Sequence, residues 1–132
     1  MSERAIGTFT VKAWDEKPIV QTDAGGKLTR ASVAGSYAGE VEGEATSEMV
    51  MCYRPDGTAD YVGLERIVGR VAGHAGTFVL RSAGAFDGTE AKATLSVVTG
   101  SGTGELTGLQ GEGEFAAPHG NQGKLQLQYR LS

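Results

Sequence analysis

Apolar and polar residues alternate along segment after segment of this chain, and that pattern limits the fold more than any other feature. A period of two is typical of a β-strand with one buried face. The clearest example lies near the C-terminus, where every second residue is apolar: Leu125, Leu127, Tyr129 and Leu131. Because no segment shows a convincing helical period, the sequence predicts an all-β fold with little or no helix.

Glycine separates the alternating segments. The 132 residues include 21 glycines and 3 prolines, about twice the usual glycine share. Strands are predicted over 5–14, 28–39, 40–53, 58–69, 77–86, 91–97, 105–115 and 124–131. Turns are predicted at 55–58, 73–76 and 87–88, a long loop over 15–27, and a bulge near Gly108. On the first strand, Phe9, Val11 and Ala13 are predicted to share one face.

Eight strands need either closure or a second sheet, because long open edges invite aggregation. We predict a single domain over 1–132 that forms a closed eight-stranded antiparallel barrel. A barrel of this size is just wide enough to be filled by side chains or to hold one small ligand. The functional question is therefore whether the interior is open or filled.

The third predicted strand has one acidic face and one apolar face. Its acidic residues share one parity: Glu40, Glu42, Glu44 and Glu48. Its large apolar residues share the other: Val41, Ala45, Met49, Met51 and Tyr53. Burying unpaired carboxylates is costly, so the acidic face is predicted to lie in solvent and the apolar face in the core. Cys52 has the parity of the acidic face, and we interpret it as an inert or interface thiol.

Charge and composition exclude several classes of partner. With 12 basic and 16 acidic residues the net charge is -4, which argues against nucleic acid. No run approaches the roughly 18 apolar residues that span a bilayer, so no membrane partner is expected. One cysteine forms no internal disulfide, and the N-terminus lacks a signal-peptide core, which indicates the cytoplasm. The two histidines, His74 and His119, lack metal-ligand spacing, so neither a metal nor a cofactor is predicted.

Four segments together resemble a known family. They are LTRASV at 28–33, YVGLERIVG at 61–69, GTFVLRSAGAF at 76–86 and VVTGSGTGELTGLQGEGEF at 97–115. With them the chain resembles the bacterial domain of unknown function family three-two-two-four from about Gly7 to its C-terminus. The resemblance implies a small closed barrel similar to plant allene oxide cyclase and to dirigent proteins. It implies no established catalytic activity.

The resemblance does not extend to the chemistry of the cyclase. That enzyme holds a fatty-acid epoxide in an apolar cavity and uses a buried glutamate on its first strand. Here the first predicted strand offers Thr8, Phe9, Thr10, Val11 and Lys12, with no carboxylate before Asp15. The cyclase reaction is therefore not transferred to this chain.

Candidate site residues are few. Glu65 and Arg66 are adjacent on a predicted strand, so they point to opposite faces and only one can reach the interior. A structural salt bridge is the alternative for this pair. His119 at the barrel rim is a further candidate for proton transfer. Candidate ligand-binding residues are the aromatic and methionine side chains Trp14, Met49, Met51, Tyr53, Tyr61 and Tyr129, for which core packing is the alternative.

Two functional hypotheses follow from the sequence. In the first, the barrel binds a small apolar or amphipathic metabolite and could isomerise it through one luminal polar residue. In the second, the barrel is a non-catalytic homo-oligomeric structural or interaction module with a filled interior. The second rests on 62–68, which is apolar on both faces and so suggests an outer surface buried against another subunit. The sequence leaves open whether the protein is an enzyme.

Overall fold

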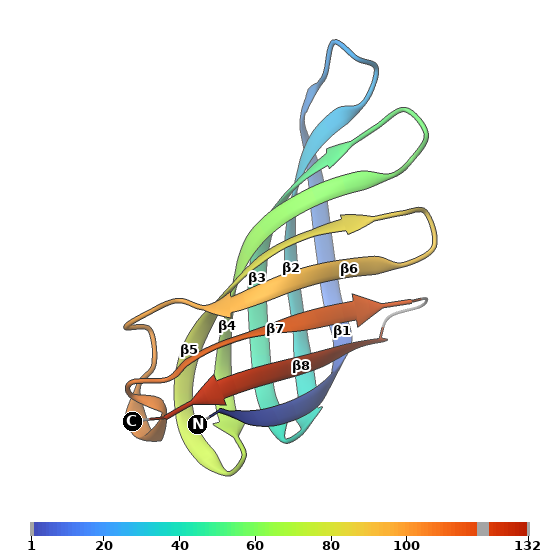
Figure 1. Ribbon diagram of the computed structural model, residues 1–132. Helices are drawn as coiled ribbons and strands as arrows, with labels where there is room; N and C mark the ends of the chain where they lie inside the picture. Colours follow the sequence, from blue (N-terminus) through green and yellow to red (C-terminus); the bar gives the residue numbers. More distant parts are fainter. Residues whose placement is uncertain (1, 119–121, 132) are drawn as a thin grey trace.

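Eight antiparallel strands close into a barrel in the computed structural model (Figure 1). The structure describes residues 2–118 and 122–131. The strands are β1 (Glu3–Gln21), β2 (Lys27–Gly39), β3 (Val41–Tyr53), β4 (Ala59–Val71), β5 (His74–Phe86), β6 (Ala91–Val97), β7 (Gln110–Ala117) and β8 (Gln122–Arg130). Each strand pairs with the next in sequence, and β1 pairs with β8 from Glu3 opposite Tyr129 to Thr10 opposite Gln122. The predicted closed all-β barrel is confirmed.

The two ends of the barrel differ. Figure 1 shows the long hairpins β1–β2, β3–β4 and β5–β6 at the upper end, and both chain termini at the lower end. A short 3-10 turn, η1 (Gly104–Leu106), also lies at the lower end. Over 2–118 and 122–131, no helix has the length and apolar character that a membrane crossing requires.

Packed side chains fill the lower half of the barrel. The largest fully buried residues are Phe78, Ile67, Leu80, Leu106, Leu109, Leu125, Leu127, Val41 and Val71. Those on strands alternate with more exposed residues, as the period-two pattern requires. Burial of this apolar set is the main stabilising contribution to the fold. The filled-interior hypothesis therefore describes this half of the barrel.

The seventh predicted strand, 105–115, is wrong over its first five residues. The chain instead forms η1 and a turn, and β7 begins at Gln110. Leu106 and Leu109 are 0% and 1% exposed, and their spacing of three residues suits a helical turn that aims both inward. Gly104 and Gly108 adopt φ values of +61° and +85°, which an extended strand does not contain. Gly108, where a bulge was predicted, is thus part of a turn whose buried leucines close the lower end of the barrel.

The predicted loop over 15–27 is also wrong, because β1 continues to Gln21 and pairs with β2. A bulge between Val11 and Ala13 shifts the register. The extra residue reverses the side-chain parity, so Ala13 is exposed and Trp14 lies opposite the buried Val33. A second shift follows between Pro18 and Val20. These interruptions break the alternation by which a strand is recognised in sequence.

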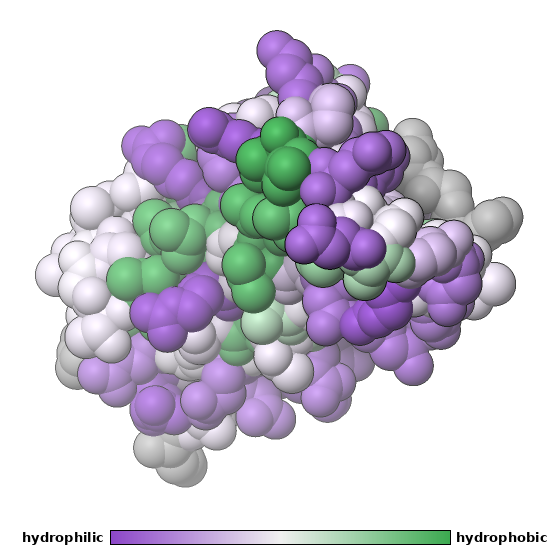
Figure 2. All heavy atoms as spheres, turned by 90° about the horizontal axis from the view of Figure 1, so that it is seen from above, coloured by the Kyte–Doolittle hydropathy of each residue, from purple (hydrophilic) through white to green (hydrophobic). Residues whose placement is uncertain are grey.

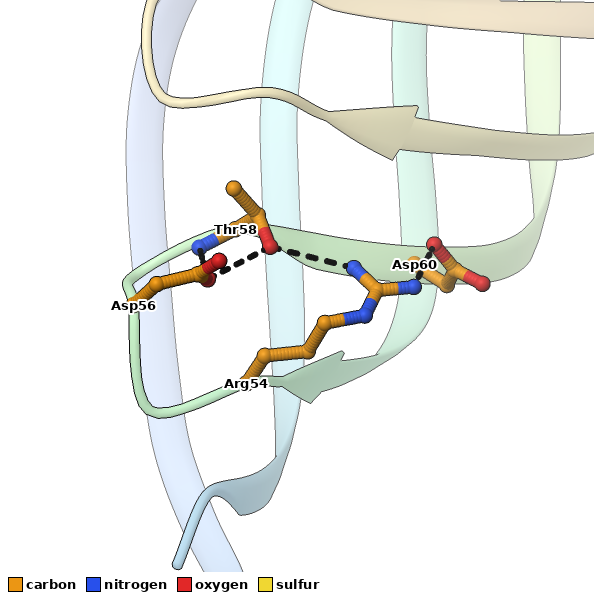
Figure 3. A network of polar contacts seen from close by, with 4 residues as sticks. All are labelled: Arg54, Asp56, Thr58 and Asp60. Atoms are coloured by element: carbon orange, nitrogen blue, oxygen red, sulfur yellow. Dashed lines mark hydrogen bonds and ion pairs between the residues drawn. The ribbon is translucent and has the colours of Figure 1, made fainter.

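The β3–β4 hairpin has the predicted turn at 55–58. Asp56 Oδ1 accepts hydrogen bonds from the Thr58 backbone N–H at 2.9 Å and from the Thr58 hydroxyl at 2.7 Å (Figure 3). Arg54 donates to Thr58 Oγ1 at 3.2 Å and to Asp60 Oδ1 at 2.8 Å. The β4–β5 turn lies earlier than predicted, because Ala72 and Gly73 have positive φ and β5 already begins at His74.

The acidic side of β3 faces solvent, as predicted. Glu40, Glu42, Glu44 and Glu48 are exposed, and Cys52 on the same face is exposed with a free thiol. Lys12 Nζ lies 2.8 Å from Glu44 Oε1, and Arg30 Nη2 lies 2.9 Å from Glu48 Oε1. Such exposed ion pairs contribute little to the stability of a fold, because water and salt screen the charges.

Candidate functional site

A cavity of about 400 Å³ occupies the upper half of the barrel. All eight strands contribute to its wall, from Phe9 on β1 to Gly123 on β8. The space exists because inward positions on β6 carry small residues, among them Ala91 and Ala93. The larger side chains on the opposite wall of the barrel leave this cavity unfilled. The upper half is therefore open where the lower half is packed.

Glu65 on β4 points into this cavity, whereas its neighbour Arg66 is exposed outside the barrel. The Tyr37 hydroxyl on β2 donates a hydrogen bond of 2.8 Å to Glu65 Oε1. Burial raises the pKa of Glu65 to about 7, and the hydrogen bond from Tyr37 opposes that rise. Burial, together with the charge of Glu65, also raises the pKa of Tyr37 well above its usual value. Glu65 can therefore exchange a proton near neutral pH.

The surroundings of Glu65 are mostly apolar. Ser47 lies directly opposite Glu65 in the β3–β4 register, and Ser82 is the second serine in the wall. Among the described residues that line the cavity, Glu65 alone carries a formal charge. Phe9 lies 4.9 Å from Tyr37 and 6.1 Å from Phe115 between ring centroids. The cavity thus combines one carboxyl group with a wall of aromatic and aliphatic side chains.

A second carboxylate, Glu16, lies at the upper end beside the cavity. It accepts hydrogen bonds from the Thr29 hydroxyl at 2.7 Å, the Tyr53 hydroxyl at 2.8 Å and the Trp14 indole N–H at 3.0 Å. Burial raises the pKa of Glu16, but these hydrogen bonds outweigh burial and leave the pKa below its usual value. Burial and Glu16 together raise the pKa of Tyr53 to about 12. These contacts hold Trp14 and Tyr53, which line the cavity, in place.

The upper face of the molecule is apolar at its centre. Figure 2 views this face from above and shows hydrophobic residues gathered within a surround of hydrophilic ones. Exposed apolar side chains on β1 include Trp14, Ile19 and Val20. Trp14 belongs both to this exposed set and to the cavity wall. An apolar molecule would therefore meet compatible surface at the end where the cavity lies.

The structure places most of the residues singled out from the sequence in one region. Five candidates line the cavity: Trp14, Met49, Met51, Tyr53 and Tyr61. Tyr129 does not, since it lies 3% exposed among the core residues and donates a 3.1 Å hydrogen bond to Glu3. Glu65 faces the cavity and Arg66 does not. His119 lies outside the described residues.

Sequence reasoning missed the residues that complete the site. Tyr37 was not singled out, although it continues the inward alternation of Val33 and Gly35 on β2. Phe115 packs on the bare backbone of Gly123, where an added Cβ would lie 2.3 Å from the ring. The alternation of β2 was a usable signal for Tyr37. The contact of Phe115 with Gly123 depends on strand pairing and gave no local signal.

The described part of the chain shows no metal centre. Within 2–118 and 122–131, no group of three or more His, Cys, Asp and Glu side chains is arranged to hold a metal ion. Glu16 and Glu65 each receive hydrogen bonds from neutral donors. Each of the two carboxylates therefore already has a neutral donor on at least one of its oxygens.

Comparisons with known proteins give a family without an assigned activity. The model of a family described as "Protein of unknown function (DUF3224)" matches residues 5–129. A crystal structure of a protein of unknown function from that family, from Shewanella oneidensis MR-1, is similar with a TM-score of 0.80 and 28% sequence identity. The similarity covers 100% of this chain and 99% of that one. No curated protein matches the sequence.

Proposed function

Because the chain belongs to the DUF3224 family, as its motifs predicted, and that family has no assigned activity, we propose a function from the cavity itself. The barrel binds one small apolar or amphipathic molecule in its upper half. The observation that carries this proposal is the 400 Å³ cavity beside a packed lower half. Small-molecule sites in proteins typically measure about 300–1,000 Å³, with mostly apolar walls and few polar groups.

The composition of the wall supports a binding role. Met49 and Met51 supply flexible side chains that adapt to an irregular ligand. Tyr61 combines apolar surface with a hydroxyl group that can orient a bound molecule, and Trp14 adds further apolar surface. The exposed free Cys52 is compatible with a reducing compartment, so we place this binding role in the cytoplasm.

The same site supports proton transfer as an extension of binding. Glu65 has a pKa of about 7, and a general acid or base works best when its pKa lies near the working pH. Tyr37 orients the carboxyl group through their hydrogen bond. An isomerisation in the lumen would use Glu65 to move the proton. The carboxyl group lies on β4, unlike the first-strand glutamate of the cyclase, so a shared reaction is not implied.

Filling the cavity is expected to weaken ligand binding. Ala93 is an 8% exposed residue of the cavity wall, so Ala93→Phe places a ring in the space for ligand. The neutral fluorescent dye N-phenyl-1-naphthylamine is expected to bind the wild type. Ala93→Phe is expected to lower the affinity for the dye by about tenfold or more, which corresponds to a loss of about 1.4 kcal/mol in binding free energy. Fluorescence titration measures the effect.

Ala83→Phe is the matched control for this prediction. Ala83 is exposed on the outer face of β5, beside Thr94 of the strand that carries Ala93. The control adds the same ring outside the barrel and is expected to leave dye affinity unchanged. Equal affinity of the two variants, or no binding to the wild type, would contradict luminal binding. Native mass spectrometry of freshly purified protein checks for a retained molecule.

A second candidate function, homo-oligomer assembly, is favoured by the outer face of β3 and β4. Four apolar side chains are exposed there, namely Val50 at 44%, Val62 at 58%, Leu64 at 53% and Val68 at 43%. Val50 and Val62 are register partners and Leu64 follows Val62 on the same face, so these three side chains are contiguous, whereas the exposed Arg66 separates them from Val68. Contiguous exposed apolar surface commonly marks an interface. We propose that a second copy of the chain packs on this face through a two-fold contact.

Introducing a charge into this patch is expected to dissociate the oligomer. Wild-type protein at micromolar concentration should scatter light as a dimer or larger assembly, and Leu64→Lys as a monomer, because the lysine charge would have to be desolvated at the contact. Thr94→Lys makes a similar charge change at an exposed position on β6 and should leave the assembly intact. A monomeric wild type would remove this candidate.

A further inference from the structure

The charge and the hydrogen-bonding groups in the cavity wall indicate the chemistry of the ligand. This inference rests on the proposed luminal binding. We propose that the lumen selects amphipathic molecules with a protonated amine and an aromatic or aliphatic body, and disfavours carboxylates. The amine would pair with Glu65, and the apolar body would lie against the aromatic wall. This ligand class is opposite in charge to a fatty acid.

The first argument is the sign of the charge in the cavity wall. Glu65 is the one residue with a formal charge among the described residues that line the cavity, and none of them is a lysine or arginine. A carboxylate entering the cavity would lose its hydration without gaining a cationic partner, and Glu65 would repel it. An ammonium group would instead gain an opposite charge in a weakly polar setting, where the attraction is stronger than in water.

The second argument is the number of hydrogen-bonding groups near Glu65. Tyr37 donates to Oε1, and no described residue donates to Oε2. Ser47 lies opposite Glu65 across the β3–β4 pair, and Ser82 also lines the cavity. An ammonium group has three donors, which matches a free carboxylate oxygen and neighbouring hydroxyl oxygens. A ligand without a donor would leave Oε2 unpartnered.

The third argument is the aromatic wall. The rings of Phe9, Tyr37 and Phe115 cluster together, with the planes of Phe9 and Phe115 inclined at 73°. Aromatic faces attract a nearby cation and also pack well against another ring. These rings therefore favour an arylalkylamine, in which a short chain joins an aromatic group to the ammonium.

Proton linkage separates this proposal from a neutral alternative. A ligand with a carbonyl oxygen would bind the protonated form of Glu65 and accept its hydrogen bond, so binding would take up about half a proton at pH 7. An ammonium ligand would bind the ionised form and release about half a proton. The other described titratable residues in the cavity wall are Tyr37, Tyr53 and Tyr61. Glu16 and Lys27 lie next to Tyr53 at the upper end, with the Lys27 ammonium 5.2 Å from the Tyr53 ring centroid. The raised pKa values of the three tyrosines and the lowered pKa of Glu16 keep these four groups in one protonation state near neutrality.

Three ligands of one shape test the proposal by isothermal titration calorimetry at pH 7: 4-phenylbutylamine, 4-phenylbutan-1-ol and 4-phenylbutyrate. The amine is expected to bind about tenfold more tightly than the alcohol and about a hundredfold more tightly than the carboxylate. Repeating the titration in phosphate and Tris, which differ in ionisation enthalpy, should show net proton release for the amine.

Glu65→Gln is expected to lower the affinity for the amine to the level of the affinity for the alcohol. The variant should bind the alcohol as the wild type does, which would show that its cavity is intact. Glu112→Gln, an exposed glutamate on β7, should change neither. An alcohol that binds as tightly as the amine, or a preferred carboxylate, would overturn the amine preference and leave luminal binding standing. Binding of none of the three would overturn both.

Discussion

Replacing Glu65 with glutamine is expected to raise the free energy of unfolding above pH 8 by about 3 kcal/mol, since each pKa unit corresponds to 1.36 kcal/mol. Burial moves the pKa of Glu65 from 4.5 to about 7 in the folded protein. Between these two values the folded state keeps a proton that the unfolded chain has released. The stability of the wild type therefore falls as the pH rises through this window and levels off above it.

Glutamine removes this dependence without removing the local contact. Its side-chain oxygen can still accept the hydrogen bond that Tyr37 donates to Glu65. Below pH 4.5 the wild-type carboxyl is protonated in both states, so the two proteins should be nearly equal in stability. The gain should appear only as the pH rises.

Urea unfolding of wild type, Glu65→Gln and Glu112→Gln at about pH 3.5 and pH 8.5 measures this difference. The lowered pKa values of Glu16 and Asp87 contribute stability that is lost at acidic pH, with the opposite slope. Because both proteins share these groups, subtracting one curve from the other isolates Glu65. Parallel curves for wild type and Glu65→Gln would show that the carboxyl is well solvated.

Strands with unbroken alternation could be predicted from sequence because side-chain parity is a local property. β8 and β3 are the clearest cases, with Leu125 and Leu127 inward on one, and Val41 inward with Glu42 outward on the other. β1 was underestimated because its bulge after Val11 reverses the parity part-way along the strand. Residues 105–109 were misassigned because a spacing of three, rather than two, aims Leu106 and Leu109 inward.

The site was harder to predict because it depends on the register between neighbouring strands. Tyr37 and Glu65 come from β2 and β4, which are separated by β3. Their 2.8 Å contact spans small inward residues on β3, Ala45 and Ser47. The orientation of Glu65 was ambiguous because exposed Val62 and Leu64 make the outer face of β4 as apolar as its inner face.

Loss of an aromatic ring is expected to have very different effects in the two halves of the barrel. Phe78 is 0% exposed and lies in the packed lower half, so Phe78→Ala should lower the free energy of unfolding by about 3–5 kcal/mol. Phe115 is partly exposed and lines the cavity. Phe115→Ala enlarges a space that already exists, so its cost should be about 1–2 kcal/mol, in proportion to the smaller area withdrawn from water.

Chemical denaturation of both variants measures the contrast, and the dye titration gives an independent readout. Phe115→Ala should still bind N-phenyl-1-naphthylamine, because Phe9 and Tyr37 keep the aromatic wall in place. Equal destabilisation by the two substitutions would mean that the upper half packs as tightly in solution as the lower half. In that case the small residues Ala91 and Ala93 would permit closer approach of the strands rather than provide room for a ligand.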